Sequence, residues 1–267
     1  MEKLTIAQIK KMLTEEISSE QLAELKLDER KGVQLAIKSY EKRLKKIENE
    51  KLEFQNRLKI ERDLWDKGIE YIAGVDEVGR GPLAGPVVTA AVILPHDFDV
   101  FEVNDSKQLS EKKREELYKK ILEKAVAVSV GLSDNNLIDE VNIYEATRLA
   151  MKQAIESLNI TPQKIIVDAM TIDTKIPQLR LIKGDAKSAS VAAASIVAKV
   201  TRDHLMQFYA RIYPGYGFEK NDGYGTKQHL EGLENKGVTP IHRQSFEPVK
   251  KNLIKIIQRK PYFYVSY

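Results

Sequence analysis

One stretch of the chain guides the interpretation of the rest. It reads Tyr71-Ile72-Ala73-Gly74-Val75-Asp76-Glu77-Val78-Gly79-Arg80-Gly81-Pro82. An apolar run typical of a buried strand ends here on two acids and enters a glycine-rich turn. Buried charges are costly unless they are paired or bind a metal. Glycine lets a phosphate or another backbone approach closely, and Arg80 suits a bidentate contact with phosphate. The stretch therefore indicates metal-assisted phosphoryl-transfer chemistry, although solvated acids at an ordinary strand exit remain the alternative.

The overall composition limits the class of protein. The 267 residues, 42% of them hydrophobic, suffice for one large domain and an appendage. The net charge of +4 favours an anionic partner only weakly, and the absence of cysteine excludes disulfides and thiolate metal sites. No apolar run approaches the about 18 residues that a membrane span needs. The N-terminal residues also lack the apolar core of a secretory signal. We therefore expect a cytoplasmic protein with no membrane partner.

Charged residues divide the chain into two regions. They make up 30 of the first 68 residues but only 52 of the remaining 199. The helical pattern of the first region stops at Gly68, and glycine is a common residue at the end of a helix. We therefore expect a helical N-terminal extension over residues 1–68, which serves as a substrate-binding aid, and a second domain over residues 69–267.

The first region has the pattern of three helices. Thr5 and Ser18 each stand three residues before a glutamine, which is the spacing of a capping box. A longer helix is expected from about residue 31 to residue 65. Its apolar stripe needs a partner surface, which is the two short helices, the main domain or another chain. The stripe consists of Ile37, Tyr40, Leu44, Ile47, Phe54, Leu58 and Trp65.

A basic patch on the same long helix has two interpretations. It is either a solvated helix face or an additional contact with a nucleic-acid backbone. The net charge of residues 1–68 is only +2, so this region is not a polybasic arm. The patch consists of Lys38, Lys42, Arg43, Lys45 and Lys46.

The second region alternates between strand and helix patterns. The first two strands flank the glycine-rich turn and are expected to form an antiparallel pair. The order of the elements indicates an α/β fold, with a mixed sheet flanked by helices. The expected strands cover residues 72–75, 87–94, 125–132, 164–167 and 179–182, and the expected helices cover residues 111–123, 142–158 and 186–209.

Acidic residues follow three of these strands. Asp76 and Glu77 end the first, Asp168 ends the fourth, and Asp185 closely follows the fifth. Ligands of α/β proteins bind where strand ends meet, and carboxylate oxygens suit Mg²⁺ or Mn²⁺. Two such ions could hold the attacking and leaving oxygens of an in-line displacement. Neighbouring residues on a regular strand face opposite sides, so Asp76 and Glu77 share a site only if the strand ends or bulges there. Asp105 is expected only to order its loop.

The pattern of motifs resembles that of ribonuclease HII, the type 2 ribonucleases H. The resemblance covers about residues 70–250, and the motifs occur in the same order as in the family. They are Asp76–Val87, Asn104–Lys107, Val167–Ala169, Lys183–Ser188, Ala192–Asp203, Gly223–Thr226 with His229, and His242–Phe246. The resemblance implies a ribonuclease H-like five-stranded mixed sheet with a helical C-terminal part. It says little about residues 1–68.

The resemblance also implies an activity. Such an enzyme cuts the RNA strand of RNA–DNA hybrids and incises 5′ of single ribonucleotides embedded in duplex DNA. Two-metal-ion catalysis with Mn²⁺ or Mg²⁺ leaves 3′-hydroxyl and 5′-phosphate ends. The implied role is removal of misincorporated ribonucleotides and RNA primers. We expect a monomer. Its expected partners are RNA–DNA hybrids, ribonucleotide-containing duplex DNA and the DNA-replication clamp.

The site residues are carried over one by one. Four acids would bind the metal: Asp76, Glu77, Asp168 and Asp185. The turn Gly79-Arg80-Gly81 would recognise the ribonucleotide's 2′-hydroxyl and the neighbouring phosphate, and Tyr224 would stack on the sugar at the junction. We expect Lys107, Lys187 and Arg202 to bind backbone phosphates. The alternative is that these three residues are ordinary surface cations.

Three hypotheses remain open from the sequence. The first is the ribonuclease described above, for which the sister type, ribonuclease HIII, is the near variant; its turn lacks the Gly-Arg-Gly-Pro form. The second is a DNA nuclease or recombinase of the same fold, and the third is a module that binds hybrids without cutting them. His96, His204, His229 and His242 lack metal-ligand spacing, so structural roles are expected for them. The aromatic tail over residues 261–267 is expected to pack on the domain, with stacking on nucleic acid as the alternative.

Overall fold

A computed structural model describes residues 4–259, so the aromatic tail over residues 261–267 lies outside the described residues. The chain divides into two compact units, Met1–Gln55 and Asn56–Tyr267. This division falls before the expected boundary near Gly68. The reason is that helix α4 (Lys59–Trp65) packs inside the second unit. Three of its side chains join a buried cluster there, which contains Ile60, Leu64 and Trp65 together with Ile72, Ile166 and Val191.

The first unit is built from two short helices and most of a long one around a small core. Helices α1 (Ile6–Met12) and α2 (Ser19–Lys26) begin with the capping boxes that the spacing of Thr5 and Ser18 predicts. Two residues of the apolar stripe, Ile37 and Tyr40, pack against these short helices, which settles the partner of that part of the stripe. The core consists of Ile9, Leu13, Val33, Ile37 and Tyr40.

The long helix expected over residues 31–65 is interrupted. Helix α3 (Lys31–Arg57) ends just before Leu58, and α4 begins just after it. Leu58 has a ψ of −5°, well away from the value of about −42° that continues an α-helix. The interruption separates the helix that belongs mainly to the first unit from the helix that packs in the second.

The second unit contains a five-stranded mixed sheet, as expected. The strand order is β3-β2-β1-β4-β5. The pairs β1–β2 and β2–β3 are antiparallel, whereas β1–β4 and β4–β5 are parallel. The strands are β1 (Ile72–Val78), β2 (Val87–Ile93), β3 (Ala127–Ser133), β4 (Lys164–Asp168) and β5 (Gln178–Leu181).

Helices cover the sheet and continue beyond it. Helix α6 begins seven residues before its expected start at residue 142, and Asn142 interrupts it with a φ of 73°. The last three helices form the expected helical C-terminal part. The helices that follow β2 are η1 (Ser106–Gln108), α5 (Glu111–Lys124), α6 (Asn135–Glu156), η2 (Gly184–Ala186), α7 (Ala189–Ile212), α8 (Phe218–Asn221), α9 (Lys227–Lys236) and α10 (Val249–Arg259).

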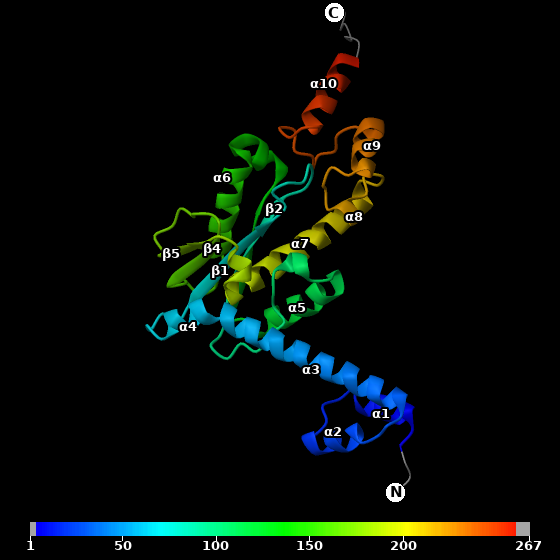
Figure 1. The fold of residues 1–267 in the computed structure, drawn as a ribbon. Helices are drawn as coiled ribbons and strands as arrows, with labels where there is room; N and C mark the ends of the chain where they lie inside the picture. Colours follow the sequence, from blue (N-terminus) through cyan, green and yellow to red (C-terminus); the bar gives the residue numbers. More distant parts are fainter. Residues whose placement is uncertain (1–3, 260–267) are drawn as a thin grey trace, which may run out of the picture. The chain divides into compact units, whose positions relative to one another are not determined.

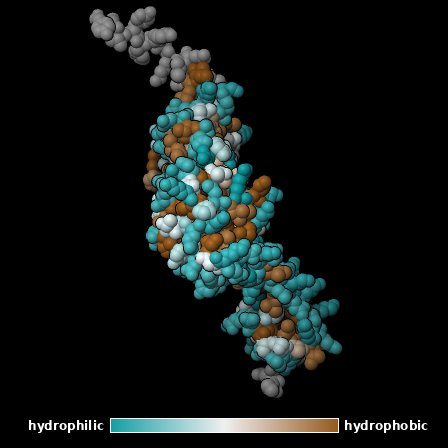
Figure 2. All heavy atoms as spheres, turned by 90° about the vertical axis from the view of Figure 1, so that its left-hand side faces the viewer, coloured by the Kyte–Doolittle hydropathy of each residue, from teal (hydrophilic) through white to brown (hydrophobic). Residues whose placement is uncertain are grey.

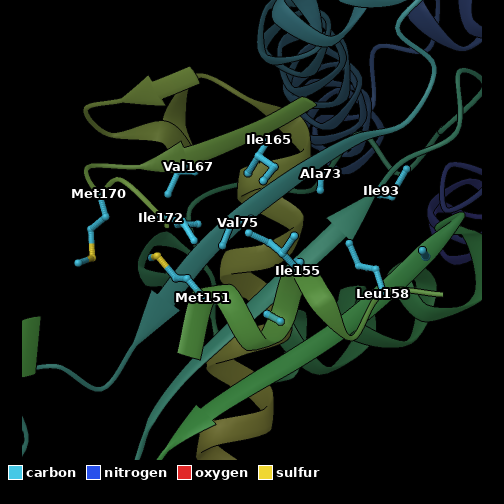
Figure 3. Packing of buried hydrophobic residues seen from close by; sticks show 13 residues of the cluster. Ala73, Val75, Ile93, Met151, Ile155, Leu158, Ile165, Val167, Met170 and Ile172 are labelled. Atoms are coloured by element: carbon cyan, nitrogen blue, oxygen red, sulfur yellow. The ribbon is translucent and has the colours of Figure 1, made fainter. Parts of the chain in front are cut away.

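Alternation along the central strand assigns the two main helices to opposite faces of the sheet (Figure 1). Ala73 and Val75 lie in the cluster with Met151 of α6, and Figure 3 shows this packing. Gly74, between them, faces α7. A Cβ on Gly74 would lie 2.1 Å from the Ser190 carbonyl carbon, so only glycine permits this close approach of helix and strand. The helix α7 therefore lies directly against β1, whose end carries the acids.

The surface in Figure 2 is mixed in character. Hydrophobic residues lie in small groups between hydrophilic ones on the face that is drawn. Among residues 4–259, no helix is both long enough and apolar enough to cross a membrane.

Candidate active site

Four acids lie at neighbouring strand ends of the second unit. Strand β4 lies between β1 and β5 and is parallel to both. Asp76 and Glu77 lie near the end of β1, Asp168 ends β4, and Asp185 lies in η2 after β5. The carboxyl ends of adjacent parallel strands meet at one edge of a sheet. The structure therefore gathers the four acids that the sequence singles out.

Asp76 and Glu77 remain on a regular strand. The register of β1 against β2 is unbroken through Val78, so no bulge turns the two side chains to one face. The pairing of β1 with β4 ends earlier, at Val75. Asp76 alternates with Val75 like Gly74 and therefore lies on the α7 face. Regular pleating alone would turn Glu77 away from that face, yet the charges of Asp168 and Lys107 both act on its carboxyl group. The bulge or strand end that the sequence calls for is therefore not seen between these two residues.

The two acids of β1 are held in unfavourable surroundings for charge. Burial raises the pKa of Asp76 well above its ordinary value, and the charge of Glu77 raises it further. The carboxylates of Asp168 and Asp185 add to this repulsion. Burial also raises the pKa of Glu77, although the nearby charge of Arg80 opposes the shift. Arg80 Nη1 lies 3.4 Å from Glu77 Oε1.

A fifth acid, Asp105, lies near these four, on the loop before η1. Burial raises the pKa of Asp185, and the charges of Asp105 and Asp168 act in the same direction. Lys107 opposes this shift. Burial alone would lower the pKa of Lys107, but the charges of Asp105, Asp76 and Asp185 outweigh burial and raise it. Asp105 therefore contributes to the charge of the site, in addition to ordering its loop through a bond from the Lys107 N–H.

Asp168 links two of the acidic segments. Its Oδ1 accepts a hydrogen bond of 2.7 Å from the Gly184 N–H. Gly184 stands directly before Asp185, and Lys183 before it adopts the left-handed conformation with a φ of 56°. This bond ties the end of β4 to η2 and fixes the position of Asp185 relative to Asp168.

The acids provide suitable ligands for a hard divalent cation, but not a finished coordination sphere. Within residues 4–259, no three histidine or acidic side chains are arranged to hold one ion. The donor set is nevertheless entirely oxygen, which Mg²⁺ and Mn²⁺ prefer. Glu77 Oε2 is buried and has no hydrogen-bond partner in the described part of the chain. A buried acceptor without a donor is rare and costly, and a cation between the acids would satisfy it and relieve their repulsion.

The glycine-rich turn lies beside Tyr224. Gly79 is buried with a φ of 89°, a conformation that favours glycine, and Gly81 is exposed. A Cβ on Gly81 would lie 3.4 Å from Tyr224 Cε1, so the turn backbone and this ring are neighbours. The Leu83 N–H also donates to the Gly223 carbonyl next to Tyr224. The Tyr224 side chain is 48% exposed, which leaves ring surface free for a ligand.

The position of Arg202 does not fit the expected contact with a substrate phosphate. Its side chain is fully buried and donates to the carbonyl oxygens of Pro86, Ala84 and Asp222. A guanidinium without exposed atoms cannot reach a phosphate. The expected phosphate contact of Arg202 is therefore wrong. Arg202 instead supports the glycine-rich turn through its hydrogen bonds to backbone carbonyls. Lys107 and Lys187, in contrast, are both exposed.

Two histidines join the segment around Tyr224 to the residues after α9. The Thr239 N–H donates to His242 Nδ1 at 2.9 Å, so the proton of a neutral His242 lies on Nε2. His242 Nε2 lies 2.9 Å from His229 Nε2, and His229 Nδ1 lies 2.9 Å from the Tyr224 carbonyl. His242 Nε2–H therefore donates to His229 Nε2, and His229 Nδ1–H donates to the Tyr224 carbonyl oxygen. Burial and the neighbouring His229 lower the pKa of His242 to about 4.

The remaining two histidines, His96 and His204, are exposed at the surface.

Two residues that support the site could not be identified from the sequence. Glu61 of α4 and Arg243 are buried polar residues whose hydrogen-bond partners are far away in sequence. The signal for Arg243 lies within the motif His242–Phe246, but nothing local indicates which groups its guanidinium would meet.

Comparison with known proteins decides the family. The family model of ribonuclease HII matches residues 73–249, and that of the ribonuclease HII N-terminal domain matches residues 5–65. The chain belongs to the ribonuclease HII family. It is 99% identical over 255 residues to the ribonuclease HII of Ligilactobacillus salivarius, covering 96% of this chain and 100% of that protein. As a member of this family, the protein is an endonuclease, a hydrolase that acts on the RNA of RNA–DNA hybrids.

Solved structures share the ribonuclease H-like fold of the second unit. The ribonuclease H2 of Pyrococcus horikoshii is 31% identical with a TM-score of 0.61, covering 70% of this chain and 99% of that one. An RNase HII from Archaeoglobus fulgidus, solved as a complex with PCNA, is 27% identical with a TM-score of 0.57. That similarity covers 66% of this chain and 95% of the archaeal one. The fold expected from the motifs is thus confirmed.

Proposed function

We propose that this protein hydrolyses the RNA strand of hybrids and incises 5′ of single ribonucleotides in duplex DNA. The products would carry 3′-hydroxyl and 5′-phosphate ends. One observation carries this proposal: the exposed glycine of the turn lies against the Tyr224 ring, on a loop that leaves the strand bearing Asp76 and Glu77. A backbone that can read a 2′-hydroxyl and a ring that can stack on a sugar are therefore joined to the acids.

The four acids would hold the divalent cations. We assign Asp76, Glu77, Asp168 and Asp185 as ligands, with Mn²⁺ or Mg²⁺ as the metal and two ions as the number. When bound, such ions supply charge stabilisation and an activated water for in-line displacement. The raised pKa values of three of these acids support the assignment, because a bound cation would offset the repulsion that raises them. Lys107 already supplies part of that compensation.

Recognition of the ribonucleotide would rest on the turn and Tyr224. The N–H groups of Arg80 and Gly81 have no acceptor among the described residues, so they are available to a 2′-hydroxyl. The Arg80 side chain would reach the neighbouring phosphate by exchanging its long contact with Glu77. Lys107 and Lys187 would hold further backbone phosphates, which position the duplex without reading its sequence.

The remaining assignments concern partners and cellular role. The archaeal RNase HII that was solved with PCNA supports a contact of this chain with the replication clamp. We also propose that the enzyme is a cytoplasmic monomer that removes misincorporated ribonucleotides and RNA primers. The first unit would assist substrate binding. Its long helix α3 carries the basic residues Lys38, Lys42, Arg43, Lys45 and Lys46.

The decisive experiment is cleavage of duplex DNA that carries one ribonucleotide. The reaction is run with Mn²⁺ or Mg²⁺, with EDTA, and beside an all-DNA duplex of the same sequence. We expect one cut 5′ of the ribonucleotide, none after EDTA treatment and none in the all-DNA duplex. Cleavage of RNA tracts without cleavage at a single ribonucleotide would contradict the assignment of the turn.

A further inference from the structure

Arg243 binds the inner side of the glycine-rich turn. Its side chain is fully buried, although it lies more than 150 residues after the turn. Nη2 donates to the Gly79 carbonyl at 2.5 Å, and Nη1 donates to the Arg80 carbonyl at 2.8 Å. Nε and Nη2 both donate to the Gly85 carbonyl, at 3.0 and 2.9 Å. One guanidinium therefore holds three carbonyl groups, at the beginning and the end of the turn.

Arg202 supports the same turn from below. Its guanidinium holds the carbonyl groups of Ala84 and Pro86 at 3.2 and 3.0 Å. A Cβ on Gly79 would lie 2.1 Å from Arg202 Nε, so the turn rests directly on this side chain. The third bond of Arg202 reaches the Asp222 carbonyl at 2.8 Å, two residues before Tyr224. The two arginines thus fix most of the carbonyl groups of the turn.

Peptide geometry converts this support into an orientation of N–H groups. In a trans peptide unit the carbonyl and the following N–H point in opposite directions. The Gly79 carbonyl shares its peptide unit with the Arg80 N–H, and the Arg80 carbonyl shares its unit with the Gly81 N–H. Because both carbonyls point to the buried Arg243, both N–H groups point away from it. These are the two N–H groups for which the described residues offer no acceptor.

We propose that Arg243 is a positioning residue for ribonucleotide selectivity, which it sets by orienting the N–H groups of Arg80 and Gly81 toward the substrate. This inference rests on the proposed function of the turn. Arginine suits the task because its planar fork offers five donors in fixed directions. A lysine at this position has one nitrogen, which cannot span carbonyls at both ends of the turn.

The surroundings of Arg243 agree with a role that requires geometry. Burial and the neighbouring charge of Arg202 lower the pKa of Arg243 to about 9. Among the described residues, the hydrogen bonds of its side chain all go to carbonyl oxygens of the turn, and none goes to a carboxylate. The charge of Asp139 opposes the lowering of this pKa only in part. A buried cation whose hydrogen bonds go only to neutral groups is expensive, and replacing buried charges by apolar side chains often stabilises a protein. Arg243 lies beneath a turn that would meet phosphate. Because buried charges are weakly screened, its positive charge would also attract that phosphate.

The test combines selectivity with a direct measurement on the turn. Arg243→Lys is compared with wild type and with Arg211→Lys, the same change at an exposed arginine of α7. The ratio of kcat/KM on a single-ribonucleotide duplex to kcat/KM on a long RNA–DNA hybrid reports selectivity. We expect Arg243→Lys to lower this ratio by about tenfold or more, since each hydrogen bond lost is worth a factor of several. Hydrogen exchange of the peptide containing residues 79–86 is expected to accelerate.

The outcomes separate the inference from the function on which it rests. Faster exchange with an unchanged ratio would overturn the role of Arg243 in selectivity, and unchanged exchange would overturn its role as a support. If wild type does not cut at the single ribonucleotide, the proposed function fails by itself. Arg202→Lys is the second variant should Arg243→Lys not fold. It loosens the turn at Ala84 and Pro86 and is expected to lower the same ratio; no change in ratio or exchange would refute the proposal.

Discussion

Glu61 connects helix α4 to the beginning of α7, and Glu61→Ala tests how much that connection contributes. The side chain is 1% exposed. Its Oε1 accepts from Ser188 Oγ at 2.5 Å, from Ser190 Oγ at 2.7 Å and from the Ser190 N–H at 3.0 Å. Ser188 is the N-cap of α7, where a negative charge also interacts favourably with the helix dipole. The change to alanine leaves three buried donors without this acceptor.

The magnitude follows from these three bonds. Hydrogen bonds to a charged group contribute about 1.5–3 kcal/mol each, but three on one oxygen are not additive. The hydroxyl groups of Ser188 and Ser190 lie 3.1 Å apart and can partly compensate each other. We therefore expect Glu61→Ala to lower the free energy of unfolding by about 2–4 kcal/mol. For a unit of this size that corresponds to a fall in Tm of roughly 4–16 °C.

The assay is denaturant and thermal unfolding of the full chain, followed by circular dichroism. Asp63→Ala serves as the matched control, because Asp63 is an exposed acid of the same helix. We expect the control to stay within about 0.5 kcal/mol of wild type, as surface changes usually do. A Glu61→Ala protein as stable as this control would refute the reasoning, and α4 would then be an appendage of the second unit rather than part of it.

Four further predictions concern the site and the two units. Asp76→Asn and Asp168→Asn are expected to abolish turnover while circular dichroism stays unchanged, because each removes a proposed metal ligand; wild-type rates in either variant would contradict the assignment. Tyr224→Ala should reduce kcat/KM on a single-ribonucleotide duplex more than on a uniform hybrid, and equal losses would rule out stacking at the junction. The lowered pKa of His242 means that the unfolded chain binds its proton first, so stability is expected to fall by up to about 3 kcal/mol as the pH drops from about 6.5 to about 4. A His242→Asn variant whose stability declines as steeply over that range would exclude this residue as the source. Deletion of residues 1–55, which leaves α4 in place, is expected to raise KM with little change in kcat, and an unchanged KM would argue against a binding role of the first unit.

The local elements of this protein could be read from its sequence because their signals are local. The β1–β2 pair is predicted by two apolar runs around a Gly/Pro turn, and the structure confirms that the two strands are antiparallel. The capping boxes at Thr5 and Ser18 require only residues three positions apart. The position of Asp168 at a strand end is of the same kind, since an apolar run ends on it. In each case the residues that determine the element are neighbours in sequence.

Element boundaries were less predictable where packing competes with pattern. The periodic pattern over residues 31–65 predicts one helix, but a break at Leu58 divides it and α4 packs in the second unit. The division of the chain therefore follows the burial of Ile60, Leu64 and Trp65 rather than the change in composition near Gly68. The change in composition reflects average solvent exposure over many residues. It cannot show that a few side chains of one short helix, three apolar and one acidic, are buried in the second unit.

The sequence by itself determined the family and the order of strands and helices, and it singled out the four candidate acids, because these depend on residue types at short spacing. Only the tertiary structure decided what the buried polar groups do. Arg202 is a cation on a helix, and its sequence neighbours give no indication that it lies beneath the turn. Arg243 and Glu61 likewise find their partners more than 100 residues away. A buried polar group must be satisfied by whichever groups the folded chain brings to it, and that choice is made by packing rather than by local sequence.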